Sequence, residues 1–425
     1  MSASSEHAPA STPRVALWRN RDFRLLWVGH TVSMFGSQIT PVAMPVIAAL
    51  TLQATPAQMA LLLSLNYAPA TLVSLFAGVL VDRMRRRPLM IATDLLSAAL
   101  LIIIPVMALL GWLQVEVLYA VTFFLGVVGV FYGLADGAFL PTLVLREQLP
   151  QANSMLATSG STARVVGPGL AGILIQWLTA PFAILIDALT FLVSAVSALL
   201  IRTAEPIPPT PERPPHVWRE IAEGLWVIVA NPYLRTFVLS AAALDIFWNA
   251  LYAVYVLYIT HELGLPPVTL GVILSAGSMA ALVSAPVAAP IARRFGIGWT
   301  LIVSQVVIGG GSLLIALALV ARPAALALLV AAEVIQVGAN AIFYILRDSV
   351  RQAATPDSLR GRVGASTMCI GLGVALLGTL VGGILGEWVG ISATISIGAI
   401  GGTFSFVWLV FSPVRRLYDL GDVRD

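Results

Sequence analysis

The sequence is dominated by continuous apolar runs of about 20 residues, separated by connections that hold most of its charged residues. A helix needs about 20 apolar residues to cross the hydrocarbon core of a bilayer. The strands of an outer-membrane barrel instead alternate in polarity over about 10 residues. Only 11% of the 425 residues are charged, against about 25% in a soluble domain. The runs therefore predict an all-α membrane protein and exclude a soluble or disordered chain.

The apolar runs predict twelve membrane spans in two six-helix halves. A proline-rich stretch after residue 201 separates the halves, and it indicates a linker that ends in a short amphipathic helix, Trp218–Ala230. The expected organisation is a tail (1–22), a first half (23–201), the linker (202–233), a second half (234–411) and a tail (412–425). The expected spans are Phe23–Leu50, Gln58–Val81, Pro88–Leu110, Val117–Leu140, Asn153–Trp177, Pro181–Ile201, Leu234–Tyr258, Thr269–Ala292, Trp299–Val320, Pro323–Leu346, Val363–Trp388 and Ser392–Phe411.

The positions of the arginines predict the orientation of the chain, because all 24 basic residues are Arg. Nearly all of them lie in the connections on one side of the spans, whereas the connections on the other side hold only Arg322. Positive residues stay in the cytoplasm when a helix bundle inserts. We therefore expect a multi-pass protein of the cell membrane with both termini in the cytoplasm. The polar residues 1–13 lack the apolar core of a signal peptide, so no cleaved leader is expected.

Residue types that are absent exclude several function classes. Without Lys the chain cannot form the phosphate loop of an ATP-driven pump, and no metalloprotease motif occurs. The single cysteine, Cys369, excludes a disulfide within the chain and a metal site of several cysteines. We expect no enzyme activity, cofactor, metal or nucleic-acid partner. We expect a monomer in the bilayer whose transport is driven by an ion or substrate gradient.

The two halves repeat weakly at an offset of 211 positions, the separation of Asn20 and Asn231. At the same offset, Gly172–Leu174 matches Gly383–Leu385, and both tripeptides have the sequence Gly-Ile-Leu. Matches at one offset in several pairs of spans indicate two similar halves, related by an axis along the membrane normal. That symmetry suits a rocking transporter whose site lies between the halves.

The strongest local motif joins the second and third spans: Gly78-Val-Leu-Val-Asp82-Arg83-Met-Arg85-Arg86-Arg87-Pro88. Gly78 would let a neighbouring helix approach, and Asp82 could pair with an arginine or with a helix N-terminus. The alternative is a positively charged segment that only ends the span on the cytoplasmic side. A second motif lies in the fifth span, where ordinary packing of small residues is the alternative: Gly167-Pro168-Gly169-Leu170-Ala171-Gly172.

Both motifs resemble signatures of the major facilitator superfamily. The first resembles its Gly-x-x-x-Asp-Arg-x-Gly-Arg-Arg loop, with Arg85 at the second Gly. The second resembles the Gly-Pro-x-x-Gly-Gly pattern of the family's antiporters, with Ala171 in place of one Gly. Three further stretches are similar to the drug:proton antiporter branch that includes macrolide-efflux and enterobactin-export proteins: Asn20–Trp27, Asp187–Phe191 and Pro356–Val363.

The resemblance implies a twelve-helix fold that works by alternating access. It implies that Gly78, Asp82, Arg83 and Arg86 form a cytoplasmic gate latch that closes onto the eleventh span. It also implies that the second motif bends or flattens the fifth span where the halves meet, through Gly167, Pro168 and Gly172.

Ionisable residues inside the spans mark candidate sites, because each is costly where it faces lipid. Burial disfavours the charged form of a carboxyl group, so such a group can carry a proton. The candidates for proton coupling are Asp245, Glu333, Asp187 and Asp136. Structural pairing is the alternative. Asp94 and Asp136 could join the cytoplasmic arginines, and Arg164 needs either water or a carboxylate, for which Asp136 and Asp187 are nearest.

Polar and aromatic residues share helix faces with two of these carboxylates. One face in the seventh span holds Asp245, Trp248, Asn249 and Tyr252, and one in the tenth span holds Glu333, Gln336, Asn340 and Tyr344. Aromatic walls with a few polar groups suit an amphipathic molecule. We expect these residues, together with His30 and Arg164, to line a substrate cavity. A packed aromatic face is the alternative.

The residues and the resemblance together predict a secondary transporter that exports amphipathic organic molecules, such as drugs or siderophore-like metabolites, in exchange for protons. The family's proton antiporters often carry an Arg in the fourth span, but Phe123–Gly133 has none, and Arg164 is the candidate substitute. One alternative is a symporter or facilitator that imports a polar nutrient. A non-transporting membrane sensor or assembly subunit is the other.

Overall fold

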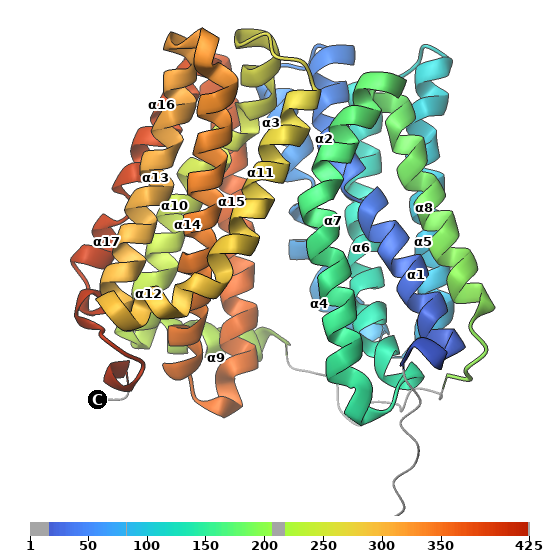
Figure 1. The fold of residues 1–425 in the computed structure, drawn as a ribbon, viewed down its shortest axis with the longest axis horizontal. Helices are drawn as coiled ribbons and strands as arrows, with labels where there is room; N and C mark the ends of the chain where they lie inside the picture. Colours follow the sequence, from blue (N-terminus) through green and yellow to red (C-terminus); the bar gives the residue numbers. More distant parts are fainter. Residues whose placement is uncertain (1–16, 82, 206–216, 424–425) are drawn as a thin grey trace, which may run out of the picture.

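Helices in the computed structural model form two bundles that lie side by side (Figure 1). The structure describes residues 17–81, 83–205 and 217–423. The first bundle comprises α1 (Arg21–Gly36), α2 (Ile39–Val46), α3 (Pro56–Ser64), α4 (Ala68–Val81), α5 (Arg86–Leu109), α6 (Val115–Leu143), α7 (Leu149–Leu178) and α8 (Ala180–Leu200). Helix α9 (Val217–Ala230) precedes the second, which comprises α10 (Pro232–Leu257), α11 (Val268–Ser284), α12 (Ala288–Phe295), α13 (Ile297–Val320), α14 (Ala325–Ala353), α15 (Arg360–Trp388), α16 (Ile391–Phe404) and α17 (Val407–Val410).

Ten helical segments of the described residues are long and apolar enough to cross a membrane. Two expected spans are not among them. The second is interrupted between α3 and α4, where Pro69 follows the break and cannot donate a backbone hydrogen bond. The fifth is α7, which is 30 residues long but carries many small and polar residues. These two helical segments and the ten apolar ones are consistent with the expected twelve-helix, all-α membrane fold.

The internal repeat is visible in the helix bounds and in the caps. At the offset seen in the sequence, α5 coincides with α13, and a π-helical turn at Ile47–Thr51 coincides with one at Tyr258–Glu262. Asn20 and Asn231 accept hydrogen bonds from the first backbone N–H groups of α1 and α10. The Asn20 Nδ2 also donates to the Leu143 carbonyl at 2.9 Å, and the Asn231 Nδ2 donates to the Ala354 carbonyl at 3.4 Å. Equivalent residues therefore make equivalent bonds in two similar halves.

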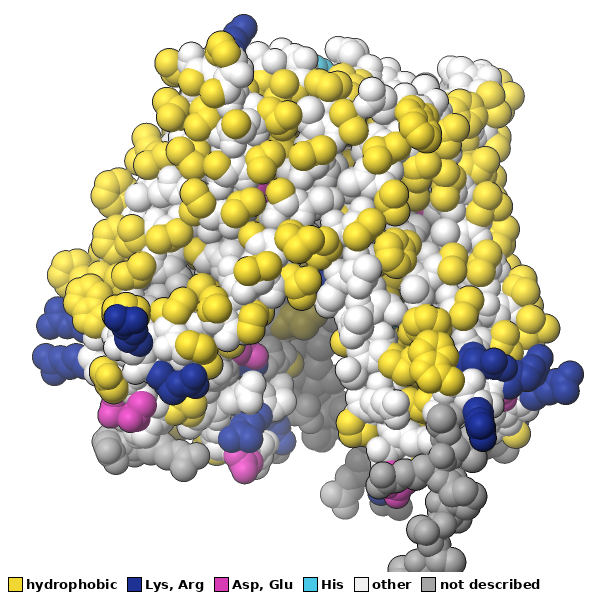
Figure 2. Space-filling model, viewed as in Figure 1, with side chains coloured by type: hydrophobic (Ala, Val, Ile, Leu, Met, Phe, Trp, Pro, Cys, Tyr) yellow, Lys and Arg dark blue, Asp and Glu magenta, His cyan; other side chains and the backbone are white. Residues whose placement is uncertain are grey.

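The two halves touch at one end of the molecule and diverge at the other (Figure 1). Arginine side chains gather at the divergent end, and the surface between the halves is hollowed there (Figure 2). We name this the open end and the opposite one the closed end. Helices α7, α14 and α15 extend past the apolar runs toward the open end, where polar residues continue the helices.

Two glycine contacts, related by the repeat, join the halves at the closed end. A Cβ atom at Gly383 of α15 would lie 2.3 Å from the Cβ of Ala60 in α3. A Cβ atom at Gly172 of α7 would lie 3.1 Å from the carbonyl oxygen of Val268 in α11. The backbone N–H of Ala57 also donates to Glu387 Oε2 at 3.3 Å. The second sequence motif, which contains Gly172, therefore lies where the halves meet.

Candidate functional site

Three cavities follow one another between and within the halves, and neighbouring cavities share lining residues. The open-end cavity, of about 570 Å³, is lined mainly by α10, α14 and α15. It shares Tyr67 and Asn249 with the central cavity, of about 490 Å³, which lies between the halves. The central cavity shares Thr40 and Pro41 with the first-half cavity, of about 460 Å³. Three neighbouring cavities thus lie one after another from the open end inward.

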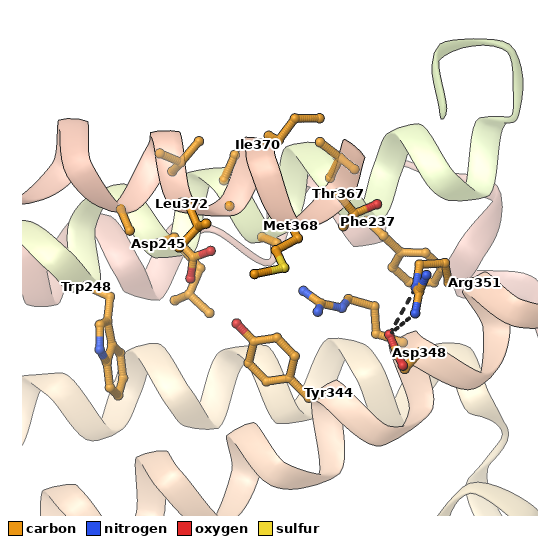
Figure 3. Close-up of a pocket in the computed structure, with 18 of the residues that line it drawn as sticks. Phe237, Asp245, Trp248, Tyr344, Asp348, Arg351, Thr367, Met368, Ile370 and Leu372 are labelled. Atoms are coloured by element: carbon orange, nitrogen blue, oxygen red, sulfur yellow. Dashed lines mark hydrogen bonds and ion pairs between the residues drawn. The ribbon is translucent and has the colours of Figure 1, made fainter. Parts of the chain in front are cut away.

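The open-end cavity combines a carboxylate, a guanidinium group and aromatic rings. Asp245, Tyr344 and Met368 come from three different helices and point toward one another (Figure 3). The Arg347 guanidinium carbon lies 4.1 Å from the ring centre of Tyr344, within range of a cation–π interaction, and the charge of Arg347 also acts on Asp245. Trp248 adds a second aromatic wall. Apolar walls with opposite charges suit an amphipathic ligand.

Glu333 lies behind the wall of the central cavity. Tyr252 lines that cavity, and its hydroxyl donates to Glu333 Oε2 at 2.6 Å. The Tyr252 ring stacks on Trp248 with ring centres 4.9 Å apart. Glu333 itself is only 5% exposed. A Cβ atom at Gly277 of α11 would lie 2.6 Å from Glu333 Cγ, so this glycine makes room for the carboxyl group. Tyr252 therefore links the carboxyl to the cavity.

Gln336 lines none of these three cavities, contrary to the prediction. It is fully buried, and Ser312 of α13 donates to its Oε1 at 3.0 Å. Three positions along a helix turn about 300°, so Gln336 lies about 60° from the face of Glu333. The Gln336 side chain therefore points toward α13. Asn340 and Tyr344 lie within about 20° of the Glu333 face, and both line the open-end cavity.

The first-half cavity holds His30, Arg164 and Asp187. The Asp187 carboxylate accepts hydrogen bonds from Thr40 and Thr190. Arg164 is exposed to the cavity, its Nη2 donates to Ser161 at 3.2 Å, and the described residues offer it no carboxylate partner. Of the two alternatives for Arg164, the structure therefore shows exposure to a cavity and not pairing with Asp136 or Asp187, because helix rotation gives each carboxylate a different partner.

Asp136 and Asp94 belong to a polar cluster in the first half. His30 Nδ1 lies 3.4 Å from Asp136 Oδ1 and 3.4 Å from the Tyr132 hydroxyl. Asp94 is fully buried beside Ser194, within electrostatic range of His30 and Asp136. Neither carboxylate forms an ion pair with an arginine in the part of the chain that the structure describes. The alternative in which both join the arginines of the open end is therefore wrong.

In this conformation, Gly78 of the gate motif is not packed against the second half. A Cβ atom at Gly78 would meet no other atom within 4 Å, so the expectation that Gly78 admits a neighbouring helix is wrong here, because the halves have separated. Asp82 lies outside the described residues. Arg83 is exposed. The backbone N–H groups of Arg86 and Arg87 donate to the Glu205 carboxylate at 2.6 and 3.1 Å.

Sequence reasoning missed three residues of the site: Arg347, Tyr67 and Thr40. The helical period was the available signal for Arg347, since it follows Asn340 and Tyr344 at i+7 and i+3 on the same face of α14. Because Arg347 is charged, it was expected in a connection between spans and not in a cavity. Tyr67 and Thr40 carried no signal, because their roles come from contacts across the fold.

Tyr67→Phe is expected to weaken the contact between the halves. The Tyr67 hydroxyl donates to Asn249 Oδ1 at 3.1 Å, between the open-end and central cavities. A net loss of about 1 kcal/mol would shift the balance between conformations about fivefold. Spin-label distances between the halves in lipid nanodiscs would measure the shift. An unchanged distance distribution would show that this bond does not favour the present conformation.

Two helical halves around a central series of cavities, open at one end, define a membrane transporter fold. Solved structures of other transporters superpose on this fold. A bacterial homologue of the iron transporter ferroportin, in an inward-facing state, superposes with a TM-score of 0.71 at 17% identity, covering 92% of this chain and 98% of that one. A bacterial homologue of the human lysosomal transporter Spinster gives 0.67 at 14% identity, covering 95% and 96%. At these identities the likeness concerns the fold alone.

A family model described as transmembrane secretion effector matches residues 12–420. The chain belongs to this family of the major facilitator superfamily. The uncharacterized MFS-type transporter YfiS of Bacillus subtilis (strain 168) is 25% identical over 389 residues, 88% of this chain and 89% of that protein. The multidrug efflux pump Tap of Mycolicibacterium fortuitum is 29% identical, covering 83% and 86%. Macrolide efflux protein A of Streptococcus pyogenes is 28% identical over 210 residues, 49% of this chain and 51% of that protein.

Proposed function

We propose that this transporter exports amphipathic organic molecules in exchange for protons. The observation that carries the proposal is the open-end cavity, in which Asp245 and Arg347 lie among Trp248, Tyr344 and Met368. Aromatic and thioether groups adapt to varied apolar surfaces. The charged pair can bind the polar part of a molecule. The relatives named for macrolide and multidrug efflux support export as the direction.

The open end faces the cytoplasm in this proposal. Arginines gather around it (Figure 2), and positively charged connections remain on the cytoplasmic side. Both termini then lie in the cytoplasm, and the structure represents the inward-facing state that loads substrate. The two halves, 23–201 and 234–411, rock about the glycine contacts of the closed end, and one monomer contains the whole pathway.

Protons bind the carboxyl groups in the half of the transport cycle in which no substrate is bound. Asp245 lies in the cavity that loads substrate, whereas Glu333 is reached through the Tyr252 hydroxyl. Asp187 and Asp136, beside the first-half cavity, are further carriers in this proposal. An ionised carboxylate buried with a single partner is costly, so we infer that proton binding at Glu333 depends on whether water reaches Tyr252. Alternating access would then couple the proton to the substrate.

Asp245→Asn is expected to abolish export, because the substituted amide keeps the shape of the cavity but loses the negative charge that lines it together with Arg347. The measurement uses a pH-sensitive dye in everted membrane vesicles, to which amphipathic compounds, macrolides among them, are added in turn. The wild-type protein should show compound-dependent dequenching and the variant none. Asp357→Asn serves as the matched control, since Asp357 is an exposed partner of Arg360 outside the cavities.

Two results would overturn the proposal. Net uptake of a polar nutrient down its gradient, without proton movement, would indicate an importer. Proteoliposomes that contain only this protein and move no compound would indicate a sensor or an assembly subunit.

A further inference from the structure

A groove on the outer side of the second half lies apart from the three cavities. It has a volume of about 750 Å³ and shares no lining residue with the three cavities. It forms because the 3-10 turn Ala285–Val287, which contains Pro286, separates α11 from α12, and α12 then packs against α13 and α14. Helix α12 lies toward the open end (Figure 1).

The groove is lined by apolar side chains that face away from the protein. They include Phe295, which is 58% exposed, and Trp299, which is 61% exposed, with Val303, Val307 and Ile342 deeper along the groove. Exposed apolar surface of this kind marks a contact with a membrane or with another molecule, and acyl chains cover it in a bilayer. Trp near the end of a span is typical of the headgroup level of a bilayer. The groove therefore runs from the headgroup level into the hydrocarbon region.

Four exposed arginines gather at the mouth of the groove. Arg293 and Arg294 form the last turn of α12, and the Arg294 guanidinium lies 5.4 Å from the centre of the Phe295 ring. The C-terminal segment brings Arg415 and Arg416 to the same place, because the Gly298 N–H donates to the Leu417 carbonyl at 2.8 Å. None of the four forms an ion pair within residues 17–81, 83–205 and 217–423.

Two carboxylates of the C-terminal segment, Asp419 and Asp422, offset part of the positive charge of this cluster. Asp422 accepts hydrogen bonds from the backbone N–H groups of Tyr418 and Asp419, and Asp419 accepts one from Gly421. Both carboxylates are thus engaged within the C-terminal segment. The four arginines outnumber these two carboxylates, so the head of the apolar groove keeps a net positive charge, which matches a ligand with a negative headgroup and a long acyl chain.

We propose that this groove binds an anionic phospholipid. One acyl chain lies along Val303 and Val307 beneath Trp299, and the phosphate contacts Arg293 and Arg294. The bound lipid covers the seam at which α12 crosses α13 and α14, so it stabilises the second half at the end that opens. This inference is independent of the compound that the transporter moves.

The test is native mass spectrometry of the full-length protein titrated with phosphatidylglycerol and with phosphatidylcholine of the same acyl chains. Wild-type protein should retain phosphatidylglycerol preferentially. Arg293→Gln with Arg294→Gln should weaken that binding by about tenfold or more, and Val303→Trp, which fills the groove, should weaken both lipids. Arg24→Gln with Arg146→Gln removes two exposed arginines from the first half and should change nothing.

Three outcomes would overturn the proposal. Equal affinity for the two lipids would show that the arginines do not select a headgroup. Equal losses in the two double variants would show a diffuse charge effect and no built site. Full phosphatidylglycerol binding by Val303→Trp would show that the acyl chain lies elsewhere.

Discussion

Replacing Glu333 by Gln is expected to abolish proton-coupled export while the protein still inserts in the membrane. Gln matches the size of Glu and can still accept the Tyr252 hydrogen bond, which is 2.6 Å long in the wild-type protein. It cannot release or take up a proton. Compound-dependent proton movement in everted vesicles should therefore fall to the level of vesicles that lack the protein.

A measurement of substrate exchange down its gradient distinguishes a variant that has lost proton coupling from a variant that has not folded. Counterflow of a labelled substrate in proteoliposomes needs only the conformational change, so Glu333→Gln should retain most of it. Glu116→Gln is the matched control, since Glu116 is exposed in the first turn of α6. Tyr252→Phe should have an intermediate effect of about tenfold to a hundredfold, because a hydrogen bond to a charged group is worth about 1.5–3 kcal/mol. Normal proton movement by Glu333→Gln would exclude this carboxyl as the proton carrier.

Hydrophobic runs predicted the fold well because lipid imposes a strong constraint on every span. They could not show that the first expected span breaks after Gly36, or that the second is divided between Ser64 and Ala68. The apolar run of the tenth expected span ends at Leu346, whereas α14 continues to Ala353. Polar residues there continue the helix beyond the bilayer, where apolarity is no longer required.

The candidate site was predictable only where one helix face decided it. On α10, Asp245, Trp248 and Asn249 follow the helical period and line the open-end cavity together. The partners of charged residues were not predictable, because they depend on how separate helices rotate and pack. Arg164 and Asp136 illustrate this: the sequence made them possible partners, whereas the fold places Asp136 beside His30 and exposes Arg164 to a cavity.

Gly383→Leu is expected to prevent the halves from closing against each other. A single Cβ atom at this position would already lie 2.3 Å from the Cβ of Ala60, and the carbonyl oxygen of Pro56 would lie 3.1 Å away. Overpacking of this kind costs about 1–3 kcal/mol, occasionally more, and 1.4 kcal/mol corresponds to a tenfold change in an equilibrium. The present conformation should therefore lose about tenfold to a hundredfold in population, and export should fall by a similar factor.

Spin-label distances across the closed end, between α3 and α15, should lengthen in the Gly383→Leu variant. Gly373→Leu is the matched control, because it places the same side chain on the same helix where a Cβ would meet no atom within 4 Å. The repeat supplies an independent test. Gly172 makes the equivalent contact with Val268 and Gly271 of α11, so Gly172→Leu should reproduce the defect from the other half. If both glycine variants transport normally, the close contacts at the closed end are not the pivot of the conformational change.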